Sequence, residues 1–252
     1  MASTKNSSLL CKAVGGLFME DRFSDVTIVC QEMTFKAHRA IICTQSCFFD
    51  AALKHGFKES ISGTINLPDD DPETIRRVLC FLYQQTYNDQ YVESKSNAPG
   101  KYENRTKESE HRKTTAYNNF SVYLAADKFG ILPLKELALS KLSAWIRDHY
   151  MTPWFPKIAL EIMTSMPHDS SLLGLLVDVI SNHVYTLGNN NEILELLKDH
   201  GQLGSLIISR IVKRARVLCQ DCEALFVVDM EAGEFPHIGF FRCENCQARH
   251  ES

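Results

Sequence analysis

The sequence predicts an α+β fold in which a small mixed sheet is flanked by helices and is followed by a helical extension and a small β-hairpin. Three observations support this. Residues 26–30 and 34–38 follow the two-residue period of strands. Apolar residues then recur at helical spacing through most of the chain up to residue 211. Two C-x-x-C pairs near the C-terminus enclose two further short apolar runs.

Composition narrows the class of protein. The 252 residues, of which 44% are hydrophobic, are enough to bury a sizeable core. A net charge of −4 gives no general attraction to nucleic acid or to an anionic membrane. The sequence has neither the apolar core of a signal peptide nor the roughly 20 apolar residues of a membrane helix. We therefore expect a soluble, intracellular protein of the cytoplasm or nucleus that binds no membrane.

The first 90 residues contain the predicted sheet and the helices around it. A short amphipathic helix should precede the first strand, and its apolar stripe is Leu9, Leu10, Ala13, Val14 and Leu17. The hairpin of residues 26–38 leads into a helix that ends near Gly56, and a third strand follows at 64–67. Asp71 and Pro72 supply the N-cap and first residue of a helix. Its predicted buried stripe is Ile75, Val78, Leu79 and Leu82.

Residues 88–117 carry mixed charges and almost no apolar side chains, so burial cannot offset the entropy lost on ordering them. The sequence predicts a disordered surface insertion here, with a modification or docking loop as the alternative. Asn118 and Asn119 should then cap a helix that Gly130 closes.

The domain boundaries follow from proline positions and from the change in pattern. Pro153 and Pro156 mark the first boundary, which gives a domain at 1–150, a helical extension at 151–217 and a cysteine-containing tail at 218–252. The segment 213–216, Lys-Arg-Ala-Arg, is interpreted as a charged helix end, with a nuclear localisation patch as the alternative.

Several motifs together resemble a known family. They are D-V-T-I-V, F-K-A-H-R-A-I-I-C, S-C-F-F-D-A-A-L, G-F-K-E-S, I-N-L-P-D-D-D-P-E-T and L-C-F-L-Y-Q-Q-T-Y. Over roughly residues 7–150 the chain resembles a BTB (POZ) domain of the kind common in filamentous fungi. The resemblance implies the BTB fold and a homodimer in which the first helix packs across the partner. The alternative is that this helix covers only its own sheet.

The resemblance also implies a partner. In BTB adaptors that recruit cullin-3, a hydrophobic residue, any residue and a glutamate follow the second helix, and Phe57-Lys58-Glu59 matches this motif. Phe57 would then insert into a groove of the cullin, and Glu59 would fix the loop through backbone amides. The alternative is that Phe57 packs on its own domain. Such an adaptor presents a substrate protein to a ubiquitin ligase, and the sequence does not identify that protein.

The tail carries a metal-ligand pattern. Cys219, Cys222, Cys243 and Cys246 form two C-x-x-C pairs separated by 20 residues. The expected strands at 224–228 and 238–241 would form a hairpin that brings the four thiolates together around one structural zinc ion. Arg242 and Arg249 would offset the negative charge of the site, and incidental cysteines are the alternative. The remaining cysteines are expected in the core: Cys11, Cys30, Cys43, Cys47 and Cys80.

No catalytic residues are predicted, because the sequence lacks the H-E-x-x-H, G-x-x-x-x-G-K-[ST], G-x-G-x-x-G and G-x-S-x-G motifs. The competing function is a transcriptional or nucleic-acid-associated regulator that uses the C-terminal ribbon. Six acidic residues between Cys219 and Cys246 face the single Arg242, which argues against phosphate contact. The sequence therefore favours a BTB adaptor or scaffold.

Overall fold

The computed structural model describes residues 13–18, 20–54, 56–90, 104–218, 221–222, 225–229, 240–242, 245–246 and 249–251. The chain divides into two compact units, unit 1 at Met1–His149 and unit 2 at Tyr150–Ser252. The four-cysteine tail is grouped with the helices of unit 2 and does not form a third unit.

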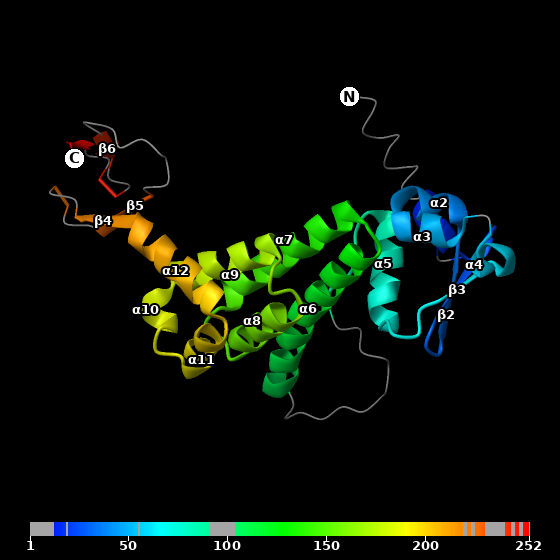
Figure 1. The fold of residues 1–252 in the computed structure, drawn as a ribbon, viewed down its shortest axis with the longest axis horizontal. Coiled ribbons are helices and arrows are strands. Elements are labelled where there is room, and N and C mark those ends of the chain that lie inside the picture. Colours follow the sequence, from blue (N-terminus) through cyan, green and yellow to red (C-terminus); the bar gives the residue numbers. More distant parts are fainter. Residues whose placement is uncertain are drawn as a thin grey trace. The chain divides into compact units, whose positions relative to one another are not determined.

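A three-stranded mixed sheet lies in unit 1 (Figure 1). Strands β1 (Val26–Cys30) and β2 (Met33–Ala37) pair antiparallel, and β3 (Thr64–Asn66) joins β1 in parallel, which gives the order β2-β1-β3. The alternate β1 residues Val26, Ile28 and Cys30 are buried. The predicted small mixed sheet is confirmed by these pairings. The two-residue period of β1 places its apolar side chains on one face, and that face is buried.

Three short helices follow the hairpin: α2 (Arg39–Gln45), α3 (Cys47–Ala52) and α4 (Lys58–Ser62). Ser46 separates α2 from α3 because its backbone is extended. Its hydroxyl accepts a hydrogen bond from the Phe49 N–H and donates one to the Phe129 carbonyl at 2.7 Å. The prediction that Cys47 is a core residue is wrong, because this first residue of α3 is exposed.

Helix α5 (Pro72–Gln84) agrees with the sequence pattern. The Asp71 carboxylate accepts the Thr74 N–H at 2.7 Å, and Pro72 occupies the first turn, as predicted. All four predicted stripe residues are buried: Ile75, Val78, Leu79 and Leu82. The C-terminal end of α5 also reaches the hairpin, because the Tyr83 hydroxyl accepts the His38 backbone N–H at 2.9 Å.

Helix α6 (Asn104–Lys128) corrects the predicted insertion, because it begins 14 residues before Asn118. The sequence reason is that residues 104–117 include good helix formers and a Glu108/Arg112 pair at the stabilising four-residue spacing. Asn119 caps nothing; it is buried within α6 and accepts a hydrogen bond from the Tyr87 hydroxyl at 2.7 Å. Residues 91–103 of the predicted insertion lie outside the described residues.

Gly130 ends α6 as predicted, since its φ of +65° is open to glycine at no steric cost. A Cβ at this position would also lie 2.2 Å from the Cys47 sulfur. Helix α7 (Leu132–His149) then packs back along α6. Its buried residues are Leu134, Ala138, Leu142, Trp145 and Ile146.

Unit 2 begins with five helices: α8 (Trp154–Ser165), α9 (Ser170–Asn182), α10 (Val184–Leu187), α11 (Asn191–Asp199) and α12 (Gly201–Lys213). Helix α12 packs against α9, where Arg210 forms a salt bridge to Asp178 at 3.3 Å. Across the described residues, no helix is long and apolar enough to cross a membrane.

Two antiparallel strand pairs follow α12: β4 (Arg214–Leu218) with β5 (Leu225–Asp229), and β6 (Phe240–Arg242) with β7 (Arg249–Glu251). The prediction of helix through residue 217 is therefore wrong after Lys213, because the backbone of 214–218 pairs with β5. The predicted pairing of 224–228 with 238–241 is also wrong. Among the described residues, β5 pairs with β4 and β6 pairs with β7, and β5 and β6 do not pair with each other.

Candidate functional site

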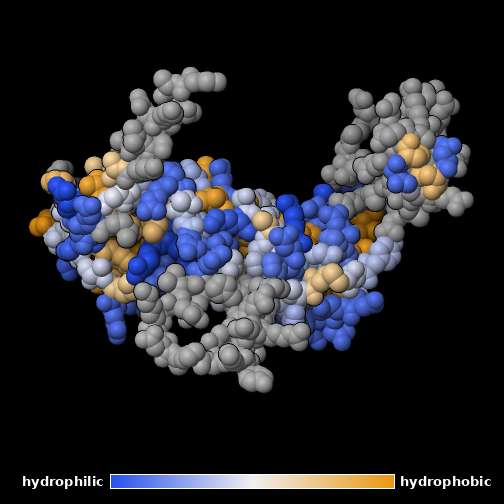
Figure 2. Space-filling view, turned by 180° about the vertical axis from the view of Figure 1, so that it is seen from behind, coloured by the Kyte–Doolittle hydropathy of each residue, from blue (hydrophilic) through white to orange (hydrophobic). Residues whose placement is uncertain are grey.

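Two exposed apolar residues of unit 1 lie at α4, beside β3 (Figure 1). Phe57 is the N-cap residue of α4 and is 57% exposed, and Ile61 is 85% exposed. Ile61 follows Phe57 by four positions, which is about one helical turn. Figure 2 shows hydrophobic residues at the surface of unit 1 among hydrophilic ones. We call Phe57 and Ile61 the α4 apolar pair.

Helix α4 is tied to the rest of unit 1 through its backbone. Gly63, at a φ of +64°, donates its N–H to the Glu59 carbonyl at 2.9 Å, and its own carbonyl accepts the Thr27 N–H of β1 at 2.8 Å. The Arg39 guanidinium donates to the Ser60 carbonyl at 3.2 Å. The helix is therefore held by β1 and α2 while the α4 apolar pair stays exposed.

The other two motif residues differ from each other in environment. Lys58 is exposed, whereas Glu59 is half-buried in the first turn of α4. Among the described residues, the Glu59 carboxylate forms no hydrogen bond or salt bridge, so the loop is held by backbone groups and by Arg39.

The segment before β1 contains part of the predicted dimer helix. Residues 13–18 are helical, and Leu9 and Leu10 lie outside the described residues. The side that faces α5 carries Gly15, where a Cβ would lie 3.3 Å from the Gln84 side chain, and Phe18, whose ring centroid is 5.1 Å from that of Tyr83. Successive residues of a helix are rotated by about 100°, so the predicted stripe with Ala13, Val14 and Leu17 is centred on a different side of the helix from Gly15 and Phe18.

The burial of that stripe follows from this orientation. Ala13 is exposed, and Val14 and Leu17 are half-buried. The helix therefore covers its own domain with Gly15 and Phe18, and Ala13, Val14 and Leu17 remain open to solvent on at least part of their surface.

A hydrogen-bond chain links the segment before β1, the hairpin and α5. The His38 Nε2 contacts the Arg22 carbonyl, which can only accept, so Nε2 is the donor. In the neutral imidazole Nδ1 is then an acceptor, and the Tyr83 hydroxyl donates to it at 2.7 Å. Burial raises the pKa of Tyr83 to about 12. This chain makes the hairpin, α5 and the segment before β1 one packed body.

Three thiols of unit 1 have surroundings that disfavour the reactive thiolate. Burial raises the pKa of the Cys30, Cys43 and Cys80 thiols, so these groups stay protonated near neutral pH. Cys30 donates to the Asp70 carbonyl at 3.2 Å. Their environment is that of packed side chains and not of nucleophiles.

The predicted metal ligands lie in unit 2. Cys222 and Cys246 are in turns, while Cys219 and Cys243 lie outside the described residues. The Asn245 side-chain amide donates to the Cys222 sulfur at 3.6 Å, so the turn that contains Asn245 and Cys246 lies close to Cys222. Groups of three or more metal-ligating side chains do not occur among the residues that the structure describes.

The mixed sheet, its flanking helices and the short helix α4 define a small α+β domain. Residues 15–103 match the family model of the BTB/POZ domain. The chain therefore contains a BTB/POZ domain, and domains of this family are protein–protein interaction modules. The match lies within the segment 7–150 that the sequence motifs indicated.

The chain is similar to Kelch-like protein 25 of Rattus norvegicus, with 35% identity over 75 residues that make up 29% of this chain and 13% of that protein. It thus spans a small fraction of that relative's length. Among solved structures it is similar to the BTB domain of zebrafish PATZ1, with 17% identity, a TM-score of 0.38, and coverage of 54% of this chain and 91% of that chain.

Ile61 is the residue of this surface that the sequence reasoning missed. It lies in K-E-S-I-S, a stretch too short and too polar to reveal a helical stripe. The available signal was its position four residues after Phe57, which becomes informative only if the segment is helical.

Proposed function

We propose that the chain is a self-associating BTB module that recruits cullin-3 through α4 and acts as an adaptor or scaffold for a further protein. The observation that supports this most strongly is the exposure of Phe57 on a helix whose backbone is already fixed. Binding by such a helix loses little conformational entropy, because the anchor is held before the partner arrives.

The chemistry of α4 fits an apolar groove. Aromatic and aliphatic anchors that enter a desolvated pocket carry most of the binding free energy in protein interfaces. Phe57 would fill the pocket and Ile61 would extend the apolar contact along one helix face. Lys58 and Glu59 would lie at the polar rim, where charges tune orientation and association rate.

Self-association would use the helix that precedes β1. Val14 and Leu17 are only half-buried on their own chain, and Ala13 is exposed. A second copy related by two-fold symmetry would cover this stripe, which continues in the sequence to Leu9 and Leu10. Two-fold dimers are the commonest closed assemblies of soluble proteins.

Calorimetric titration of the full chain with the cullin-3 N-terminal domain tests the proposal. The wild-type chain should bind at concentrations of roughly tens of micromolar, within the range that calorimetry resolves. Phe57→Ala should weaken binding at least about thirtyfold, since truncation of a central aromatic anchor costs about 2 kcal/mol or more.

The matched control is Phe23→Ala, which removes the same side chain from another site of unit 1, where it is 77% exposed. This variant should bind like the wild type. An absence of wild-type binding, or equal losses in the two variants, would refute the assignment of α4 as the cullin-3 site.

A further inference from the structure

The two cysteine pairs of the tail lie in matching connections. Leu218 of β4 is paired with Leu225 of β5, and Arg242 of β6 is paired with Arg249 of β7. Each strand pair is therefore joined by six residues, 219–224 in the first and 243–248 in the second. The two connections read C-Q-D-C-E-A and C-E-N-C-Q-A. Cysteine thus occupies the first and fourth positions of both, and alanine the sixth.

This repeat has a chemical consequence. A connection that reverses the chain between two antiparallel strands and carries cysteine at positions one and four can direct both thiolates toward one metal ion. Two connections of equal length and pattern then supply two equivalent pairs of ligands. The strand pairing adds to the cysteine spacing, because both cysteines of each pair belong to one six-residue connection between two paired strands.

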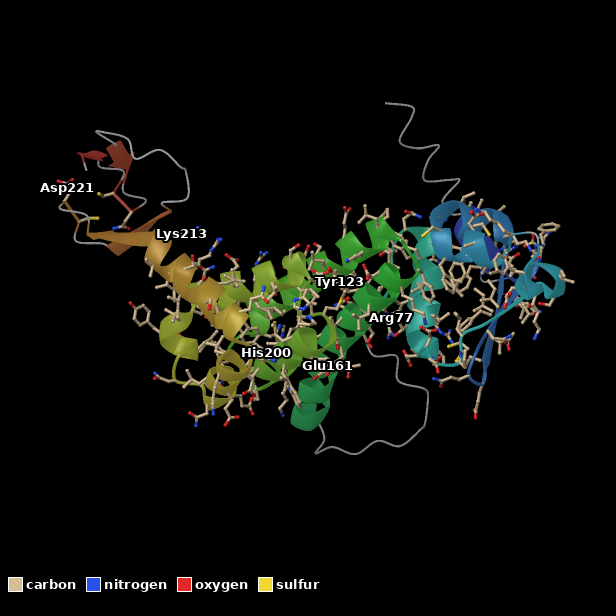
Figure 3. The ribbon with its side chains drawn as sticks, in the orientation of Figure 1. Arg77, Tyr123, Glu161, His200, Lys213 and Asp221 are labelled. Atoms are coloured by element: carbon tan, nitrogen blue, oxygen red, sulfur yellow. The ribbon has the colours of Figure 1, made fainter. Side chains whose placement is uncertain are left out.

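One contact joins the two connections. The Asn245 amide, from the second connection, donates to the Cys222 sulfur of the first at 3.6 Å, although the two residues are 23 positions apart. Hydrogen bonds from amides to sulfur are typical around metal-bound thiolates, whose negative charge they stabilise. Figure 3 shows this region beyond α12, with Lys213 at the end of the helix and Asp221 in the turn next to Cys222.

The charge pattern agrees with a metal–thiolate centre. Four thiolates and one divalent ion carry a net charge of −2. In the sequence, Arg242 directly precedes the second connection and Arg249 directly follows it, and cationic residues next to the ligands suit such an anionic centre.

From these observations we propose that Cys219, Cys222, Cys243 and Cys246 bind one Zn²⁺ ion in a closed tetrahedral site. Four sulfur ligands leave no position for water or substrate, so the ion is structural. It joins two small strand pairs that would be marginally stable alone, with five and three residues per strand. Asn245 stabilises the thiolate of Cys222 and positions it.

Metal analysis of the full chain, purified without chelator, tests this site. The wild-type protein should contain about one zinc per chain. After replacement of zinc by Co²⁺ it should show the ligand-field absorption of a tetrahedral four-thiolate centre. Cys222→Ser should lose the metal to a chelator that leaves the wild type loaded, because serine is a poor zinc ligand. Asn245→Ala should keep the ion but bind it about 10- to 100-fold more weakly.

The matched control is Cys47→Ser, which removes an exposed thiol from α3 and should leave the zinc content unchanged. Less than half an equivalent of zinc in the wild type would overturn the proposal. So would full zinc retention by Cys222→Ser, or a disulfide between the two cysteines of either pair in the native protein.

Discussion

Helices α4 and α5 both belong to unit 1, yet their apolar residues differ in exposure. Along α5, Ile75, Val78, Leu79 and Leu82 are all buried, while on α4 Phe57 and Ile61 are exposed. Both helices have fixed ends, α5 through the Asp71 cap and α4 through Gly63. An ordered backbone and a buried side chain are therefore separate properties. The buried side chains of α5 stabilise the fold, whereas the exposed side chains of α4 are available for binding.

The largest expected effect comes from truncating a side chain in the buried stripe of α5. Leu79→Ala should destabilise unit 1 by about 2–5 kcal/mol, because it leaves a cavity at a side chain that is fully buried. Hydrogen exchange of the β1 amides in the full chain measures this loss in unit 1 separately from unit 2.

The matched control for that test is Leu132→Ala, at the first residue of α7, where the side chain is exposed. It should change stability by no more than about 0.5 kcal/mol. A similar loss in both variants would mean that burial does not separate the two groups of residues.

A smaller effect is expected at the link between α5 and the hairpin. Tyr83→Phe removes the hydroxyl that accepts the His38 backbone N–H and donates to its ring, and the N–H is then buried without a partner. The cost should be about 1–3 kcal/mol, measured by the same exchange experiment.

The same tyrosine predicts a dependence on alkaline pH. Its pKa is raised from about 10 to about 12 in the folded state, so folding favours the protonated form. This contribution is complete below pH 10 and is lost as the pH rises through about 12. The free energy of unfolding of unit 1 should therefore fall between pH 10 and about pH 12, and it should fall less in Tyr83→Phe. Parallel alkaline titration curves for the two proteins would contradict this role.

The sequence predicted the sheet and α5 well because both are specified locally. The period of β1, the Asp71–Pro72 start and the apolar stripe of α5 all indicate the same elements. Helix α6 was predicted only from Asn118 onward, because residues 104–117 have no apolar stripe and their charge spacing carries a weaker signal. Likewise, the strand 214–218 was hidden by a charged composition, and its pairing with β5 is a tertiary property.

The candidate site was predicted in part. The motif gave Phe57, but only the structure reveals its exposure and the neighbouring Ile61. For the helix before β1, the hydrophobic spacing predicts a stripe that includes Ala13, Val14 and Leu17. The packing of Gly15 and Phe18 on α5 shows that this stripe faces another way. Hydrophobic spacing defines a face, whereas the partner of that face depends on contacts that are distant in sequence.

The central claim is that this BTB unit works as a self-associating binding module, and the mass of the full chain in solution tests it most directly. Light scattering at roughly tens of micromolar should give the mass of two chains, since a stable dimer has a dissociation constant below this range. Leu17→Glu should give the mass of one chain, because it puts a charge into the proposed interface, while Leu132→Glu should remain at two. A wild-type protein with the mass of one chain at this concentration would contradict the claim.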